Sequence, residues 1–115
     1  MSLGLYLHIP YCFSKCRYCD FYSHPGERGV PDAYVEALLR ELSRFAPEVP
    51  LQPDTLYFGG GTPSLLCPEQ AKRLIDAARP MPGAEITLEA NPETVTEESL
   101  AGFREAGVNR ISFGV

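Results

Sequence analysis

The sequence lacks several features that would place it outside the class of globular domains. No uninterrupted apolar run approaches the ~20 residues that a membrane-spanning helix needs, so we expect no transmembrane segment. Positive charge is not in excess: 10 Lys and Arg stand against 15 Asp and Glu, giving a net charge of -5. This balance argues against a nucleic-acid-binding protein. A hydrophobic fraction of 44% and a charged fraction of 22% exclude disorder and a collagen-like fibre.

An export signal is also missing, because residues 1–4 have no basic stretch followed by an apolar one. We therefore expect a cytoplasmic protein, whose thiols stay reduced. Of the four cysteines, Cys12, Cys16 and Cys19 are crowded together, while Cys67 stands alone. This distribution favours a metal or redox site over a disulfide framework. For Cys67 the sequence predicts a small buried hydrophobic residue or a residue at a helix start.

A strand, a loop and a helix follow one another repeatedly along the chain. The first helix has apolar residues at the spacing i, i+3, i+4, i+7 (Val35, Leu38, Leu39 and Leu42), and Pro47 ends it. Similar patterns predict strands over residues 3–9, 55–58, 85–90 and 109–115, and further helices over residues 68–79 and 96–106.

This order predicts an α/β fold of parallel βαβ units with right-handed crossovers. A TIM-type barrel and a doubly wound sheet both satisfy it. The chain holds about three and a half units, well short of the ~250 residues of a complete barrel. Both architectures stay open on the element order alone, and we expect a fragment of a longer protein.

The three crowded cysteines have the spacing C-x3-C-x2-C directly after the first strand. Short spacers let one loop wrap three thiolates around a single centre, which suits zinc or an iron–sulfur cluster. His8 or His24 could complete a zinc site of three cysteines and one histidine. The second half of a typical zinc module is absent, which favours the cluster.

Two further motifs follow strands. The glycine-rich segment 59–62 lacks the closing Lys-Ser/Thr of a P-loop; it is either a tight turn or a close backbone approach to a ligand. Glu89 shares one strand face with Glu85 and Thr87, and in a barrel this face points inward near the active site. A solvated glutamate at the end of a strand is the alternative.

Together these motifs resemble a known family. The cysteine loop, with Tyr18 before its last cysteine, is similar to that of the radical S-adenosylmethionine (SAM) superfamily. The segments LHIPYC at 7–12, GGGTPS at 59–64 and EANP at 89–92 resemble the oxygen-independent coproporphyrinogen III oxidase family, including its heme chaperone branch. The resemblance covers essentially the whole chain, and implies that residues 1–115 are the incomplete N-terminal portion of a radical SAM core domain. Of the two architectures it therefore implies the barrel, and we expect the N-terminal part of a partial TIM-type parallel β/α barrel.

The resemblance implies cofactors and residues that hold them. Cys12, Cys16 and Cys19 would bind a [4Fe-4S] cluster, with SAM on the iron that lacks a protein ligand; reductive cleavage of SAM would give a 5′-deoxyadenosyl radical. The implied contacts to SAM are Tyr6, Tyr18, Gly60, Gly61, Thr62 and Glu89. For Tyr6 and Tyr18, packing in the core is an open alternative. His8 is expected to face inward as a hydrogen-bonding residue and is not assigned as a ligand.

One residue bears on the branch. Oxidases of this family carry a further cysteine two residues after the third, where this chain has Phe21. The difference favours the heme chaperone branch, whose members bind heme and deliver it to respiratory proteins. Two alternatives remain: an oxidase that decarboxylates a porphyrinogen, and a structural zinc module. The sequence does not identify an electron donor.

Overall fold

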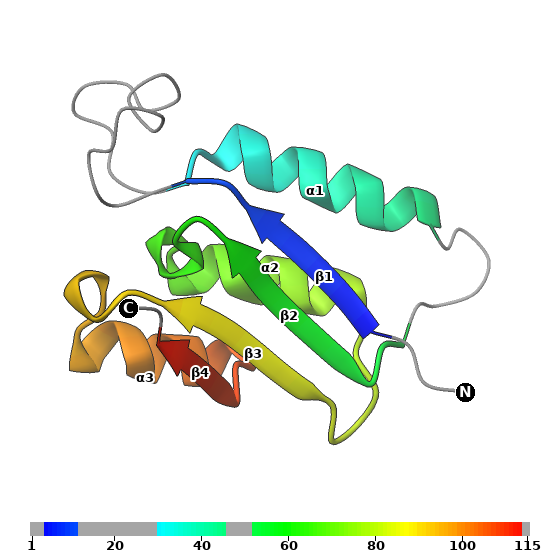
Figure 1. The fold of residues 1–115 in the computed structure, drawn as a ribbon. Coiled ribbons are helices and arrows are strands. Elements are labelled where there is room, and N and C mark those ends of the chain that lie inside the picture. Colours follow the sequence, from blue (N-terminus) through cyan, green and yellow to red (C-terminus); the bar gives the residue numbers. More distant parts are fainter. Residues whose placement is uncertain (1–3, 12–29, 46–51, 114–115) are drawn as a thin grey trace.

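The computed structural model describes residues 4–11, 30–45 and 52–113. Within them, four parallel strands form one sheet: β1 (Gly4–Ile9), β2 (Thr55–Gly60), β3 (Glu85–Ala90) and β4 (Arg110–Phe113). The helices α1 (Asp32–Phe45), α2 (Pro68–Ala78) and α3 (Glu97–Ala106) lie between successive strands in the chain (Figure 1). The predicted α/β class is confirmed.

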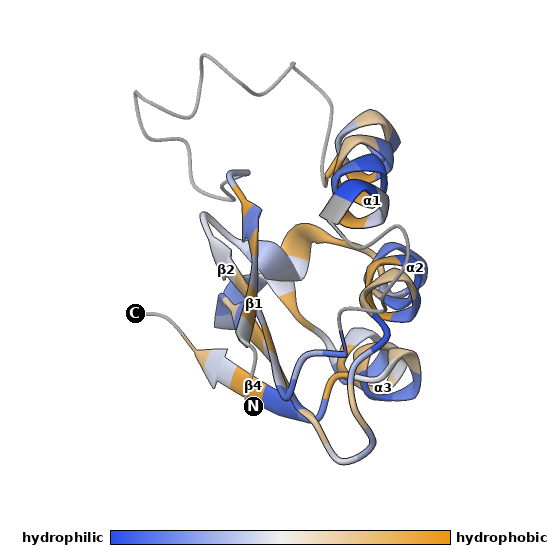
Figure 2. Ribbon diagram, turned by 90° about the vertical axis from the view of Figure 1, so that its right-hand side faces the viewer, coloured by the Kyte–Doolittle hydropathy of each residue, from blue (hydrophilic) through white to orange (hydrophobic). Residues whose placement is uncertain are grey.

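The sheet is singly wound. Its strands lie in the order of the sequence, β1-β2-β3-β4, and the three helices cover one face (Figure 2). In a doubly wound sheet the strand order reverses and helices cover both faces. The arrangement is therefore that of the first part of a TIM-type barrel, in which each crossover adds the next strand on the same side.

The core lies between the sheet and the helices. In β1, β2 and β3, alternate residues face the helices and are buried, as the period of two in a strand requires, while Ile111 of β4 is partly buried. The helices contribute apolar residues at helical spacing to this core. None of the described helices is long and apolar enough to cross a membrane. The buried cluster includes Leu7, Ile9, Leu56, Phe58, Ile86 and Leu88 from the strands, and Val35, Leu42, Ala71, Leu74, Ile75, Ala78 and Phe103 from the helices.

Two strand boundaries differ from those predicted. β2 continues through Gly59 and Gly60, because these glycines pair with His8 and Ile9 of β1. β4 starts one residue late. The side-chain amide of Asn109 replaces a strand partner there: its oxygen accepts from the Ile86 amide and its nitrogen donates to the Ala84 carbonyl, both at 2.8 Å.

Local signals in the sequence fix the helix ends. Thr96 caps α3, accepting a hydrogen bond from the Ser99 amide at 3.0 Å. Gly107 ends α3 with φ +124°, a conformation that favours glycine. Cys67 is the exposed residue directly before α2. Its predicted place at a helix start is confirmed, and the alternative of a buried hydrophobic residue is wrong.

Candidate functional site

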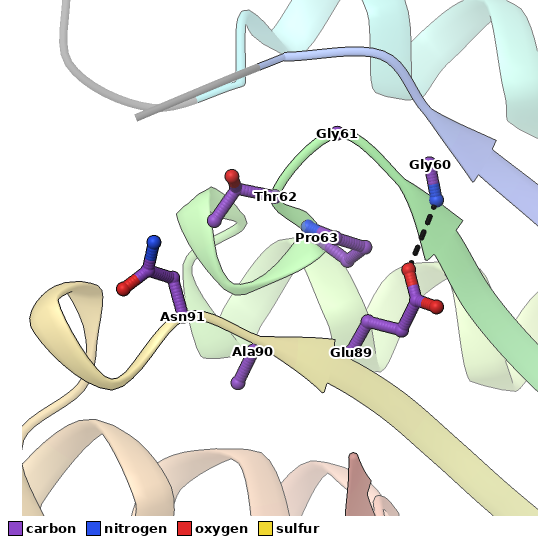
Figure 3. Close-up of a pocket in the computed structure, with 7 residues that line it drawn as sticks. All are labelled: Gly60, Gly61, Thr62, Pro63, Glu89, Ala90 and Asn91. Carbon is purple, nitrogen blue, oxygen red and sulfur yellow. Dashed lines mark hydrogen bonds between the residues drawn. The ribbon is translucent and has the colours of Figure 1, made fainter. Parts of the chain in front are cut away.

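A pocket of about 280 Å³ opens at the C-terminal ends of β2 and β3. Side chains and backbone from both strand ends and from the loops that follow them form its walls (Figure 3). Ligands of parallel β/α folds bind at this end of the strands. The lining residues are Gly60, Gly61, Thr62, Pro63, Glu89, Ala90 and Asn91.

The Glu89 carboxylate is held by two donors from the neighbouring strand. The Gly60 amide donates to Oε1 at 3.2 Å, and the Tyr57 hydroxyl donates to Oε2 at 2.7 Å. Figure 3 shows Glu89 reaching from β3 toward Gly60 on β2. Glu89 is half-buried and lines the pocket, so its oxygens are available to hydroxyl or amine donors of a ligand.

The hydrogen bond to Glu89 also acts on Tyr57. It raises the pKa of the Tyr57 hydroxyl above its usual value of 10.0, and burial and the charge of Glu89 act in the same direction. A hydrogen bond with Ser112 of β4 opposes the change, lowering this pKa. Tyr57 is therefore a protonated donor to the carboxylate at neutral pH.

Gly60 lets β2 approach β1 closely. Its φ is +121°, and a Cβ added there would lie 2.8 Å from the Ile9 carbonyl oxygen and 2.9 Å from Nδ1 of His8. The next two amides extend the junction: Gly61 donates to the Ile9 carbonyl at 2.8 Å, and Thr62 donates to the Tyr11 carbonyl at 2.6 Å. The close approach at Gly60 is thus to the chain itself, and it joins the pocket to the residues that lead into the cysteine loop.

A hydroxyl network fixes the opposite side of the pocket. Ser64 is buried, accepts a hydrogen bond from the Asn91 amide at 3.2 Å and shares another with the Thr94 hydroxyl. Thr94 in turn donates to the Asn91 carbonyl at 2.8 Å. Because these bonds link the loops after β2 and β3, the two walls of the pocket form one unit.

Aromatic rings of β1 and β2 lie on the sheet face opposite the helices. Tyr6 stacks on Tyr57 with ring centres 5.8 Å apart and planes at 12°, and on His8 at 6.2 Å and 24°. Tyr6 is 55% exposed, so it lies outside the core that the described residues form. Gly59 makes room for the stack, because a Cβ there would lie 2.5 Å from Oη of Tyr6. His8 is also exposed.

The predicted site residues that the structure describes fall into two groups. Four line the pocket: Gly60, Gly61, Thr62 and Glu89. Tyr6 lies on the neighbouring strand, stacked on the tyrosine that donates to Glu89.

The remaining predicted residues lie outside the described part of the chain: Cys12, Cys16, Cys19 and Tyr18, with Phe21 and His24. Among residues 4–11, 30–45 and 52–113, no group of three or more His, Cys, Asp or Glu could hold a metal ion. The ligand set therefore remains a prediction.

Sequence reasoning missed Tyr57. The alternation of buried Leu56 and Phe58 around it places its side chain on the opposite face from the core. This alternation could be read from the sequence. The hydrogen bond of Tyr57 to Glu89 could not, because it depends on the register between β2 and β3.

Curated relatives match nearly the whole chain. Heme chaperone HemW of Escherichia coli (strain K12) is 47% identical over 98% of this chain, and that of Mycobacterium tuberculosis (strain H37Rv) is 42% identical over 97%. The chain spans only 32% and 31% of those two proteins.

The fold matches a solved structure, that of coproporphyrinogen III oxidase (HemN) from Escherichia coli, described as a radical SAM enzyme. The TM-score is 0.77 and the identity 31%, over 99% of this chain and 28% of the other. These relatives confirm the resemblance to the coproporphyrinogen oxidase-like family and its heme chaperone branch. Residues 6–115 match the family described as the radical SAM superfamily. The chain belongs to the radical SAM superfamily.

Proposed function

We propose that this chain is the N-terminal portion of a radical SAM protein that acts as a heme chaperone, binding heme and passing it to a respiratory protein. The observation that carries the proposal is the 47% identity to a heme chaperone over 98% of the chain. Phe21, in the place of the further cysteine of the oxidases, supports the same branch. Because the chain spans about a third of its relatives, heme binding and transfer are proposed for the whole protein.

Membership of the superfamily implies a [4Fe-4S] cluster and SAM. We assign the cluster to Cys12, Cys16 and Cys19, whose spacing lets one loop supply three thiolates and leaves one iron for SAM. When bound, the reduced cluster supplies the electron that cleaves SAM. The thiolates must stay reduced to bind iron, which supports a cytoplasmic location.

The chemistry of the pocket residues supports the proposed cofactor. Glu89 is a carboxylate with free acceptor positions, as the hydroxyls of a ribose require. We assign Gly60, Gly61 and Thr62 to the methionine part of SAM, since they form the wall next to the end of β1, where the cysteine loop begins. Tyr6 and Tyr18 are assigned to contacts near the cluster and with adenine. These residues orient SAM and exclude water.

A second candidate is an oxygen-independent coproporphyrinogen III oxidase, which oxidatively decarboxylates a porphyrinogen. The structural similarity to that enzyme, with a TM-score of 0.77, favours it. The lower identity of 31%, against 47% for the heme chaperone, and the phenylalanine at position 21 argue for the first candidate.

The test uses the intact protein, reconstituted with iron and sulfide without oxygen. We expect a [4Fe-4S] spectrum that changes when SAM is added, tight binding of heme, and no consumption of coproporphyrinogen III with SAM and a reductant. Consumption of that substrate would favour the oxidase. A preparation with stoichiometric zinc and neither iron nor sulfide would overturn both candidates in favour of a zinc module.

The ligand assignment is tested by Cys16→Ala, with Cys67→Ala as the matched control. Cys16→Ala should abolish the cluster spectrum. Cys67→Ala should leave it unchanged, because Cys67 is the exposed residue before α2 and lies apart from the proposed ligands in the sequence. A normal cluster in Cys16→Ala would remove Cys16 from the ligand set.

A further inference from the structure

Tyr57 donates a hydrogen bond to Glu89, a carboxylate that lines the pocket, without lining the pocket itself. Its hydroxyl donates to Oε2 of Glu89 at 2.7 Å, and the Gly60 amide donates to Oε1 at 3.2 Å. Each oxygen of the carboxylate thus receives one donor, and both donors come from β2. Two such contacts fix the rotation of the carboxylate about its last side-chain bond.

A carboxylate has about four acceptor positions, two on each oxygen. With one position on each oxygen taken by the chain, each keeps one for a ligand in the pocket. Two adjacent hydroxyls on a ring, such as those of a ribose, can donate one hydrogen bond to each oxygen. These two hydrogen bonds form together only if the carboxylate is rotated so that each of its oxygens faces one hydroxyl.

We propose that Tyr57 is a positioning residue, which holds Glu89 so that the pocket selects a ribonucleoside over a 2′-deoxyribonucleoside. The inference rests on the proposed function, in which the ligand is SAM. The tyrosine is itself held in place, because its ring stacks on Tyr6 at 5.8 Å and 12°. Gly59 leaves the space in which these rings lie.

The experiment compares the dissociation constants of SAM and of its 2′-deoxy analogue. It uses the intact protein with a reconstituted cluster, as the unsubstituted form and as Tyr57→Phe, which keeps the ring and its stacking but removes the donor. We expect Tyr57→Phe to weaken SAM binding roughly tenfold, as for the loss of a hydrogen bond to a charged group. The analogue lacks one of the paired hydroxyls, so its binding should weaken less, and the preference for SAM should fall several-fold.

Tyr34→Phe is the matched control. It also removes one tyrosine hydroxyl, which donates to the His8 carbonyl and ties α1 to β1, whereas the donors to Glu89 are Tyr57 and Gly60. It should leave the preference for SAM unchanged, even where it lowers stability. The ratio of the two dissociation constants therefore separates positioning of Glu89 from a general structural effect.

The possible failures are distinct. If the unsubstituted protein with an intact cluster does not bind SAM, the proposed function is wrong and this inference fails with it. If the unsubstituted protein binds SAM and Tyr57→Phe keeps the full preference over the deoxy analogue, the role of Tyr57 alone is wrong. Equal weakening of both ligands would also overturn it, because a structural role predicts that result.

Discussion

The hydrogen bond between Tyr57 and Glu89 changes the pKa of the Tyr57 hydroxyl, and this change can be measured. The hydrogen bond to Glu89, together with burial and the negative charge, raises the pKa of Tyr57 above 10.0. Replacing the carboxylate by an amide in Glu89→Gln removes the charge and weakens the bond. We therefore predict that Glu89→Gln lowers the pKa of Tyr57 toward 10.0, as followed by tyrosinate absorbance near 295 nm during an alkaline titration.

The other tyrosines are removed from this signal by subtracting the titration of Tyr57→Phe. The direction of the coupled stability follows from the raised pKa. The contribution of Tyr57 to the free energy of unfolding is fully present below pH 10.0 and is lost as the pH rises from there through the raised pKa of the folded state. An unchanged Tyr57 titration in Glu89→Gln would show that the two groups do not interact in solution.

At the scale of single residues, the sequence predicts which residues belong to the site better than it predicts which residues they contact. Glu89 follows from strand alternation and from the EANP motif, and it does line the pocket. That Gly60 approaches β1 could not be predicted, because its contacts with Ile9 and His8 arise from the parallel pairing of two strands far apart in the sequence. The glycines were interpreted as leaving space for a ligand. The close approach of β1 at Gly60 is an alternative reason for glycine at that position.

At the scale of elements, Gln70 joins the starts of two helices. It is buried; its side-chain oxygen accepts from the Cys67 amide at 2.9 Å, and its nitrogen donates to the Val30 carbonyl at 2.8 Å and to Asp32 at 2.9 Å. Gln70→Ala leaves the first two groups without this partner, so we predict a loss of about 1–3 kcal/mol in the free energy of unfolding. Urea denaturation measures it.

Lys72→Ala is the matched control on the same helix. Lys72 is exposed, and its ion pair among the described residues is with Asp76 across one helical turn, an interaction worth about 0.3–0.5 kcal/mol. The two variants should therefore differ clearly in their urea midpoints. Equal midpoints would show that the contacts of Gln70 contribute no more than a surface ion pair.

The elements themselves were largely predictable, because their signals are local. Pro68 and Thr96 begin two helices at or within one residue of the predicted starts, and Gly107 ends α3 as expected. β2 is longer than predicted because pairing with β1 carries it through two glycines, which local strand propensity disfavours. Where a strand ends because of pairing with another strand, the end cannot be predicted from the residues of that segment alone.

At the scale of the whole molecule, the described core is built from the sheet and the helices that cover one face. The cysteine loop joins this framework at Tyr11, whose carbonyl accepts from Thr62, and at Val30, whose carbonyl accepts from Gln70. Thr62 lines the pocket, and Gln70 belongs to α2, which packs on the sheet through the common core. A cluster held by the loop would therefore be positioned by a framework with its own core.

We accordingly predict that removing the cluster weakens the binding of SAM but leaves residues 52–113 folded. After anaerobic chelation of iron from the intact protein, hydrogen exchange in peptides from residues 52–113 should change little, because the described core of that region consists of sheet and helix side chains. Binding of SAM should fall strongly, since the proposed site would lose the iron to which SAM is assigned. A structural zinc module behaves in the opposite way, because its metal provides the free energy of folding. Loss of exchange protection across these residues on chelation would therefore contradict the proposed role of the cluster as a cofactor on a preformed β/α framework.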